Sequence, residues 1–287
     1  MSGIITLTTD WGYGDPYAAL FRAHVWALNP QAVITDISHA VLNGNRLQAA
    51  YLLSTACWAF PAGTVHVADV RELSAEQQRK VVTKEQPLYF LDFLAVACGD
   101  QYFLMENNGM LSLLSPGFQT VGEVVRLRAQ EDYDRYNTFN ALNYYVKAAA
   151  SLAAGVPLSD LGEPYPMDRL ERIVLSSRQP SESVLEGRVL HVDARGNLIT
   201  DIRETPFRKV AQSRKKMTIS IGRCFDKLND VCLYRRYLKV PDGKCFALFN
   251  SGGYLELGQK NVSLAEMLYG EGDVRSGIGD AVTISFQ

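Results

Sequence analysis

The chain has 287 residues, which suggests roughly two domains, and 47% of them are hydrophobic, ample for a core. Its net charge is −2, from 29 basic and 31 acidic residues, so it lacks the positive surface that nucleic acids and anionic membranes attract. Five cysteines without Cys-x-x-Cys spacing argue against a disulfide frame or a zinc knuckle. Neither a signal peptide nor a membrane-spanning stretch is recognisable. We therefore expect a reduced, cytoplasmic protein that binds a small molecule or a protein partner.

The N-terminal half alternates between strand and helix patterns. Strands are predicted over 4–9, 33–37 and 64–70, and helices over 16–28 and 46–60. This alternation predicts an α/β domain whose sheet is largely parallel, with helices packed against it. Residues 87–114 read instead as adjacent β segments, and a further helix is predicted over 142–154, where Gly155 ends it.

The C-terminal half reads mostly as short strands. Residues 177–183 are polar and include Pro180, so we interpret them as a linker between an α/β domain (1–176) and a second domain (184–287). Strand patterns cover 184–192, 198–202, 217–221, 245–249, 254–257 and 281–286. Ser263 and Glu266 form a capping box for one short helix. Short strands at this density predict a small all-β barrel or sandwich.

Two carboxylates follow the first strand. Ligands of open α/β sheets bind where strands end in loops, so Asp10 is placed to meet a ligand. Asp15 stands directly before Pro16, and such a residue is also a common helix cap. Both interpretations of Asp15 stay open at this point.

The four histidines show neither metal-ligand nor catalytic-triad spacing. His24, His66 and His191 lie within apolar helix or strand patterns, which favours a structural role, and His39 follows a strand. The chain contains no P-loop, Gly-x-Gly-x-x-Gly or Gly-x-Ser-x-Gly motif. Metal dependence and a separate cofactor are therefore not indicated.

Several loop and strand-end motifs stand out along the chain. In the N-terminal half they are Thr9-Asp10-Trp11-Gly12, Asp15-Pro16-Tyr17, Ile34–His39, Phe60–Val67 and Asn107–Ser112. In the C-terminal half they are Asp193–Thr200, Asn250-Ser251 and Tyr254-Leu255-Glu256. In their order, and over nearly the whole chain, they resemble the family of S-adenosylmethionine hydroxide adenosyltransferases, fluorinases and chlorinases. Asn107–Ser112 is similar to the family's Asp-Asn-Gly-Leu-Leu segment, and Asp193–Thr200 to its Asp-Arg-Phe-Gly-Asn-Leu-Val-Thr hairpin.

The resemblance implies an N-terminal α/β domain, a C-terminal β-barrel and a homotrimer with ligand sites between subunits. It also implies displacement of methionine from the ribose C5′ of S-adenosylmethionine by water or halide. Asp10 matches the carboxylate that holds the ribose hydroxyls, Asn197 the amide that reads adenine, and Ser251 a contact to the methionine end. Further residues expected at the ligand are Trp11, Asp15, Ser74, Ala141 and Asp193, with Phe139 beside the reacting carbon.

The chain departs from the family's water-activating Asp, Arg and His. Those places hold Arg71, Gln78 and Asn140, although Arg79 could shift into the place of the Arg. If the Arg71 guanidinium came within about 4 Å of the sulfonium, repulsion would be on the order of 4 kcal/mol, while an anion would be attracted. Arg71 could instead face solvent or pair with Glu72 or Glu76. Arg71, Asn140 and Phe139 are the candidate catalytic residues.

Three functions are compatible with this pattern. The first is an enzyme, because displacement at a sulfonium needs an in-line nucleophile and a dry pocket more than a strong acid. The second is an inactive member that binds adenosine or a related nucleoside or nucleotide, because Asp10 and Asn197 are kept while the water-activating set is absent. A scaffold without a ligand ranks last, since it has no need for either residue.

Overall fold

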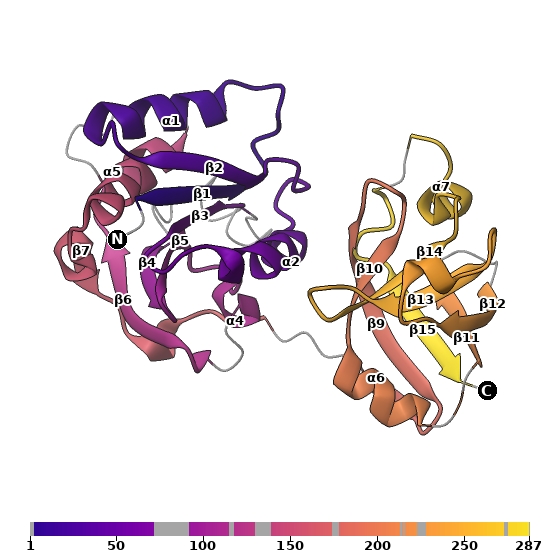
Figure 1. Ribbon diagram of the computed structural model, residues 1–287. Helices are drawn as coiled ribbons and strands as arrows, with labels where there is room; N and C mark the ends of the chain where they lie inside the picture. The colour runs from indigo at the N-terminus through magenta and orange to yellow at the C-terminus, as the bar shows by residue number, and fades with distance from the viewer. Residues whose placement is uncertain are drawn as a thin grey trace, which may run out of the picture. The chain divides into compact units, whose positions relative to one another are not determined.

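The structure, a computed structural model, describes residues 3–71, 92–114, 118–129, 139–173, 178–212, 214, 216–222, 228–272 and 275–286. The chain separates into two compact units, Met1–Val174 and Leu175–Gln287 (Figure 1). Each unit has its own buried apolar core. No helix in the described ranges is long and apolar enough to span a membrane.

A mixed sheet forms the centre of the N-terminal unit, with strand order β2-β1-β3-β5-β4-β6-β7. Its strands are β1 (Ile4–Thr9), β2 (Val33–Ser38), β3 (Val65–Asp69), β4 (Phe93–Cys98), β5 (Gln101–Glu106), β6 (Val121–Leu127) and β7 (Gly162–Pro164). Strands β2, β1, β3 and β5 are mutually parallel, whereas β4, β6 and β7 join antiparallel. The predicted parallel alternation and the adjacent β segments after it are thus both confirmed.

Helices cover both faces of this sheet (Figure 1). One face packs against α1 (Tyr17–Leu28) and α5 (Asn140–Ala154), and the other against α2 (Arg46–Ala56) and α4 (Leu111–Leu114). The predicted helix over 46–60 is shorter as an α-helix, because residues 57–59 continue it as a 3-10 turn. Gly155 ends α5 in the left-handed conformation (φ 98°), which a residue without Cβ adopts at little cost.

The interpretation of Asp15 as a helix cap is not supported. Helix α1 begins at Tyr17, so Pro16 occupies the cap position, and this end has no side-chain capping hydrogen bond. Proline suits the start of a helix because its φ angle is already close to the helical value and because it has no backbone N–H that would need a partner. Asp15 is left as an exposed carboxylate in the loop after β1.

The C-terminal unit is a barrel rather than a sandwich. Its strands are β8 (Arg178–Ser181), β9 (Val184–Val192), β10 (Leu198–Arg203), β11 (Lys216–Ile221), β12 (Leu228–Leu233), β13 (Cys245–Phe249), β14 (Tyr254–Gln259) and β15 (Ala281–Phe286). They run in the order β10-β14-β13-β12-β11-β15-β9-β8, and pairing of β10 with β9 closes the ring. The predicted α/β-plus-β-barrel organisation is confirmed. Helices α6 (Glu204–Ala211) and α7 (Leu264–Tyr269) complete the unit, and Ser263 Oγ caps α7 by accepting from the Glu266 amide at 3.1 Å.

The predicted linker is partly a strand. Residues 178–181 form β8, an edge strand that pairs antiparallel with β9. All of its side chains are exposed, so it has no apolar face and its sequence lacks the alternation that marks a half-buried strand. Strands β6 and β12 and helix α6 were likewise not predicted.

Candidate functional site

Three carboxylates gather at one edge of the N-terminal sheet. Asp10 follows β1, Asp69 ends β3 and Glu106 ends β5. The strands are parallel neighbours in the order β1-β3-β5, with Thr9 paired to Asp69 and Ala68 paired to Met105. Their carboxyl ends therefore meet, as in other open α/β sheets that bind ligands.

Asp10 is held by the backbone around it. Its Oδ2 accepts from the amide of Gly44 at 2.9 Å, and its own amide lies 3.4 Å from the carbonyl oxygen of Asp69. Burial raises the pKa of Asp10, while hydrogen bonds from the Gly44 and Arg71 amides and the charge of Arg71 oppose that rise. The result is a fixed, half-buried hydrogen-bond acceptor.

Aromatic rings form a wall beside the carboxylates. The buried Trp11 donates its indole N–H to Asp69 Oδ2 at 2.8 Å. Its ring meets Phe139 edge-on at 4.9 Å between centroids, and Tyr17 lies at the same distance from Phe139. Phe139 precedes α5, so the structure brings two of the predicted residues, Trp11 and Phe139, into contact.

Arg71 pairs with a residue that was not anticipated. Its Nε and Nη2 both lie 2.7 Å from Oε1 of Glu106. With its amide oxygen turned toward Arg71, Asn140 accepts from Nη1 at 2.6 Å and from Nη2 at 2.8 Å. The guanidinium also lies 5.6 Å from the centre of the Phe93 ring. One alternative above, pairing of Arg71 with Glu72 or Glu76, involves residues outside the described ranges. The other alternative, an Arg71 that faces solvent, is wrong, because the guanidinium is paired with Glu106.

Burial raises the pKa values of two of the carboxyl groups, Asp69 and Glu106. Burial is the main cause that raises the pKa of Glu106 to about 7, and neighbouring Asp69 and Asp10 add to it while Arg71 lowers it. The pKa of Asp69 rises to about 6, again chiefly through burial, against the hydrogen bond from Trp11 and the charge of Arg71. Carboxyl groups with such pKa values can exchange protons near neutral pH.

The other predicted residues of this unit occupy different environments. Ala141 is fully buried at the start of α5, and Asp15 is exposed. Ser74, Gln78 and Arg79 lie outside the described residues. Of the predicted set, Asp10, Trp11, Arg71, Phe139 and Asn140 therefore come together.

Asp69 and Glu106 are the site residues that sequence reasoning missed. Asp69 follows the largely apolar run Val65–Ala68, and Glu106 follows the apolar run Phe103–Met105. A charged group that breaks an apolar run at the carboxyl end of a strand is the signal that could have found both.

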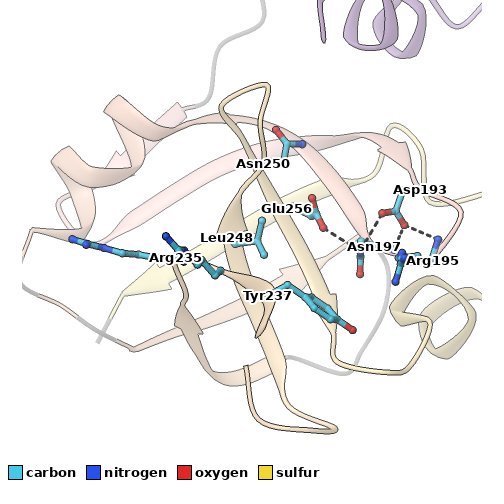
Figure 2. Close-up of a pocket in the computed structure, with 9 residues that line it drawn as sticks. Asp193, Arg195, Asn197, Arg235, Tyr237, Leu248, Asn250 and Glu256 are labelled. Carbon is cyan, nitrogen blue, oxygen red and sulfur yellow. Dashed lines mark hydrogen bonds between the residues drawn. The ribbon is translucent and has the colours of Figure 1, made fainter. Parts of the chain in front are cut away.

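A second group of predicted residues lies in the barrel. Asn197, in the turn between β9 and β10, donates from Nδ2 to Asp193 Oδ2 at 3.1 Å and to Glu256 Oε1 at 3.0 Å. Figure 2 shows the amide between these two carboxylates. Burial raises the pKa of Glu256, with Asp193 adding to the rise and the Asn197 bond opposing it.

A pocket of about 470 Å³ opens at this network. Its lining combines the network with three arginines and a hairpin end: Asp193, Arg195, Asn197, Arg235, Arg236, Tyr237, Leu248, Asn250 and Glu256 (Figure 2). Such a volume fits a small molecule rather than a macromolecule.

The orientation of Asn197 is set by its surroundings. Because Nδ2 donates to both carboxylates, Oδ1 is the side-chain atom of Asn197 that can accept a hydrogen bond. A Cβ on Gly258 would lie 2.3 Å from that oxygen. Gly258 thus provides the room that Oδ1 occupies. The predicted Ser251 is exposed in the β13–β14 turn, whose backbone is fixed by Asn250 Oδ1 accepting from Gly252 and Tyr254.

Two buried histidines are held by hydroxyl and ring contacts: His66, for which a structural role was expected, and His39, for which no role was predicted. His66 is completely buried, with Nδ1 2.6 Å from Thr6 Oγ1 and Nε2 2.8 Å from Gln101 Oε1. His39 lies 2.6 Å from Thr9 Oγ1 and stacks on Trp11 at 5.7 Å. Within the ranges that the structure describes, no cluster of His, Cys, Asp and Glu could hold a metal ion.

Family models decide the relationship. The SAM hydroxide adenosyltransferase N-terminal domain matches residues 5–162, and the C-terminal domain of the same family matches residues 187–273. The chain belongs to the SAM hydroxide adenosyltransferase family. The first segment lies within the N-terminal unit and includes the carboxylate edge, and the second lies within the C-terminal unit and includes the Asn197 network.

Relatives of similar length support this assignment. The chain is 27% identical to the (R)-S-adenosyl-L-methionine hydrolase of Thermus thermophilus, over 91% of this chain and 93% of the relative. It is 24% identical to the enzyme of the same name from Methanocaldococcus jannaschii, over 88% and 87% of the two chains. A Thermotoga maritima structure, titled as an uncharacterized conserved protein, has the same fold, with a TM-score of 0.77 at 23% identity over 98% of this chain and 99% of that chain.

Proposed function

We propose that this protein is an S-adenosylmethionine hydrolase, in which water displaces methionine from the ribose C5′ and releases adenosine. Family membership and the names of the relatives support the substrate and the reaction. The observation that carries the proposal is Asp10, a half-buried carboxylate fixed by Gly44 at the strand end. A carboxylate can accept two hydroxyl hydrogen bonds in a charge-assisted manner, which suits a ribose diol.

The charges around Arg71 suit a cationic substrate better than Arg71 alone would. An isolated guanidinium about 4 Å from a sulfonium would cost on the order of 4 kcal/mol. Arg71 is paired with Glu106, and it also interacts electrostatically with Asp69 and Asp10. Three carboxyl groups against one guanidinium make the edge neutral or negative, so the sulfonium is not repelled overall.

Asn197 is our candidate for recognition of the base. Its two donated bonds hold Oδ1 as an acceptor, and an acceptor matches the exocyclic amino group of adenine. The adjoining pocket has room for a nucleoside. Asp193 holds Asn197, whereas Ser251 stays our candidate for the methionine end, and Trp11, Asp15, Ser74, Ala141 and Phe139 for other parts of the ligand.

The family resemblance also supports a homotrimer in the cytoplasm, with each ligand between two subunits and no separate cofactor. Light scattering coupled to size exclusion tests the trimer: a mass of three chains is expected, and the mass of a single chain would contradict it. Halide in place of water, as in the chlorinases and fluorinases that the motifs resemble, is a variant of the same displacement.

The alternative is a member that binds adenosine or a related nucleoside without turnover. It is favoured by one observation: Arg71 and Asn140, which face each other at 2.6 Å, occupy places where the family has proton-accepting groups. A guanidinium and an amide do not accept a proton at neutral pH.

Incubation with S-adenosylmethionine, with and without chloride, followed by chromatography separates these functions. Adenosine and methionine are expected from a hydrolase, and a 5′-chloro nucleoside from a halogenase. Absence of all products, together with adenosine binding measured by calorimetry, would favour the binder. Asp10→Ala should abolish ligand binding under either function, whereas Asp168→Ala, which removes an exposed carboxylate elsewhere, should leave it unchanged.

A further inference from the structure

Glu106 has one oxygen in use and one without a partner. Oε1 accepts from Arg71, but Oε2 is buried and has no hydrogen-bond partner among the residues that the structure describes. The residue is only 2% exposed. Buried polar atoms are nearly always satisfied, because an unmade hydrogen bond costs about 1–3 kcal/mol. Oε2 is therefore a buried acceptor that is free to receive a hydrogen bond or a proton.

We propose that Glu106 is the general base of this enzyme, and that its Oε2 receives the proton of the attacking water. The inference rests on the proposed hydrolase function and adds a catalytic residue to it. In the family that the sequence resembles, other residue types at other positions fill this role. In this chain two of those positions hold Arg71 and Asn140. Asn140 contacts Arg71, and Arg71 contacts Glu106.

The neighbours of Glu106 hold it without competing for the proton. Arg71 fixes Oε1 with two contacts of 2.7 Å, and Asn140 fixes Arg71 in turn. Neither side chain can act as a base near neutral pH. Arg71 and Asn140 are thus positioning residues, and Oε2 is left available.

The two other carboxylates at this edge are more committed. Asp69 Oδ2 accepts from the Trp11 indole, and Asp10 Oδ2 accepts from the Gly44 amide. Asp10 is also the residue that we propose for the ribose. Among the three, Glu106 alone combines deep burial with an unpartnered oxygen in the described chain.

The titratable groups that act on Glu106 come from three elements. They are Asp10 after β1, Asp69 and Arg71 on and after β3, and Tyr145 on α5. Asp92, beside β4, is engaged elsewhere, with Tyr165 Oη at 2.6 Å. Tyr145 is buried, its hydroxyl has no partner among the described residues, and it interacts electrostatically with Glu106, so α5 adds a second polar group to the surroundings of Glu106.

The step is balanced without any further reactant. The water oxygen forms a bond to C5′ while the C5′–S bond breaks, and the bonding pair stays on sulfur, which leaves as the neutral thioether of methionine. The proton of the water moves to Glu106 Oε2 and is later lost to solvent. A base of this kind works best with a pKa near the working pH, and burial raises the pKa of Glu106 to about 7.

The test is Glu106→Gln, which keeps an oxygen for Arg71 but cannot take a proton. With S-adenosylmethionine as substrate, kcat of the wild type should fall about tenfold per pH unit below pH 7. In Glu106→Gln, kcat should drop on the order of 100-fold and lose this acid limb, while KM and adenosine affinity stay within about threefold. Glu106→Asp, which keeps the carboxylate, should recover the limb with an intermediate kcat, and thermal unfolding establishes that each variant is folded.

Asp69→Asn is the matched comparison, because it neutralises the neighbouring carboxylate and should retain the acid limb. Loss of the limb in Asp69→Asn but not in Glu106→Gln would overturn the assignment. Unchanged kcat and pH profile in Glu106→Gln, with an active wild type, would do the same and leave the hydrolase proposal intact. A wild type that forms no adenosine at any pH would overturn the hydrolase function, and the assignment of a base with it.

Discussion

Nε and Nη2 of Arg71, just beyond β3, both lie 2.7 Å from one oxygen of Glu106, at the end of β5. The Glu106 side chain is 1% exposed and that of Arg71 28%, so the pair is largely removed from solvent. A buried charge pair is seldom a strong source of stability, but loss of one partner leaves an uncompensated charge. This asymmetry makes the pair experimentally accessible.

Arg71→Met should destabilise the protein, and by more at high pH than at low pH. At pH 8 the variant must bury Glu106 either ionised and without its partner or protonated above its pKa, which costs about 3–5 kcal/mol. At pH 6, below the pKa of about 7, Glu106 is already largely protonated, so the loss should be smaller. Urea unfolding at both pH values measures the difference. The double variant Arg71→Met/Glu106→Leu should recover most of the loss at pH 8, and an equal loss at both pH values would contradict this account.

Gly258→Ala should disturb Asn197. The new Cβ would lie 2.3 Å from Asn197 Oδ1 and 2.5 Å from Phe246 Cζ, and such overpacking typically costs 1–3 kcal/mol. We expect a lower melting temperature and weaker adenosine binding by calorimetry. Gly122→Ala is the control, because its Cβ would meet nothing nearer than the Ala97 carbonyl oxygen at 3.7 Å. Wild-type stability and affinity in Gly258→Ala would show that Oδ1 does not need this position.

Asn197→Asp should weaken binding of adenosine in a pH-dependent manner. The substitution removes both donated hydrogen bonds and sets a third carboxylate beside Asp193 and Glu256. Repulsion among the three is greatest when all are ionised, so affinity should be lower at pH 8 than at pH 5.5. Asn229→Asp, an exposed change on β12 outside the pocket lining, should bind as the wild type does. Identical affinity of Asn197→Asp at both pH values would remove Asn197 from the ligand site.

His66 should make the protein sensitive to acid. Burial lowers the pKa of His66 to about 4, against the opposing hydrogen bond with Gln101, from an ordinary value of 6.5. The unfolded chain then binds more protons than the folded one between those values. The contribution of neutral His66 to the free energy of unfolding is therefore fully present above about pH 6.5 and is lost as the pH falls toward 4. The free energy of unfolding should fall by at most about 1.4 kcal/mol per pH unit from this cause.

The measurement for His66 is the free energy of unfolding from pH 7.5 to 4 for the wild type and for His66→Gln. Their difference isolates His66 from Asp69 and Glu106, whose pKa values shift in the opposite direction. The two curves should converge as the pH falls, whereas parallel curves would mean that His66 is not responsible.

Local pattern was sufficient for most of the architecture. Helix α1 and strands β9, β13 and β15 match their predicted ranges to within a residue, because each has a clear apolar face. The strand β8 was missed because its side chains face solvent throughout, and the helix α6, which spans only eight residues, was missed as well. Local pattern also left the role of Asp15 open, and the structure shows that its neighbour Pro16 occupies the cap position.

The sequence by itself determined the two-part α/β and barrel organisation, the family, and the location of Asp10 after the first strand. These follow from periodicity and from motifs whose residues are close along the chain. Only the tertiary structure decided the partner of Arg71, which is Glu106, 35 residues further along the chain. Strand order brings such residues together, and burial then sets their pKa values. Neither effect is contained in local spacing, because both depend on which distant segments share an edge of the sheet and exclude water from it.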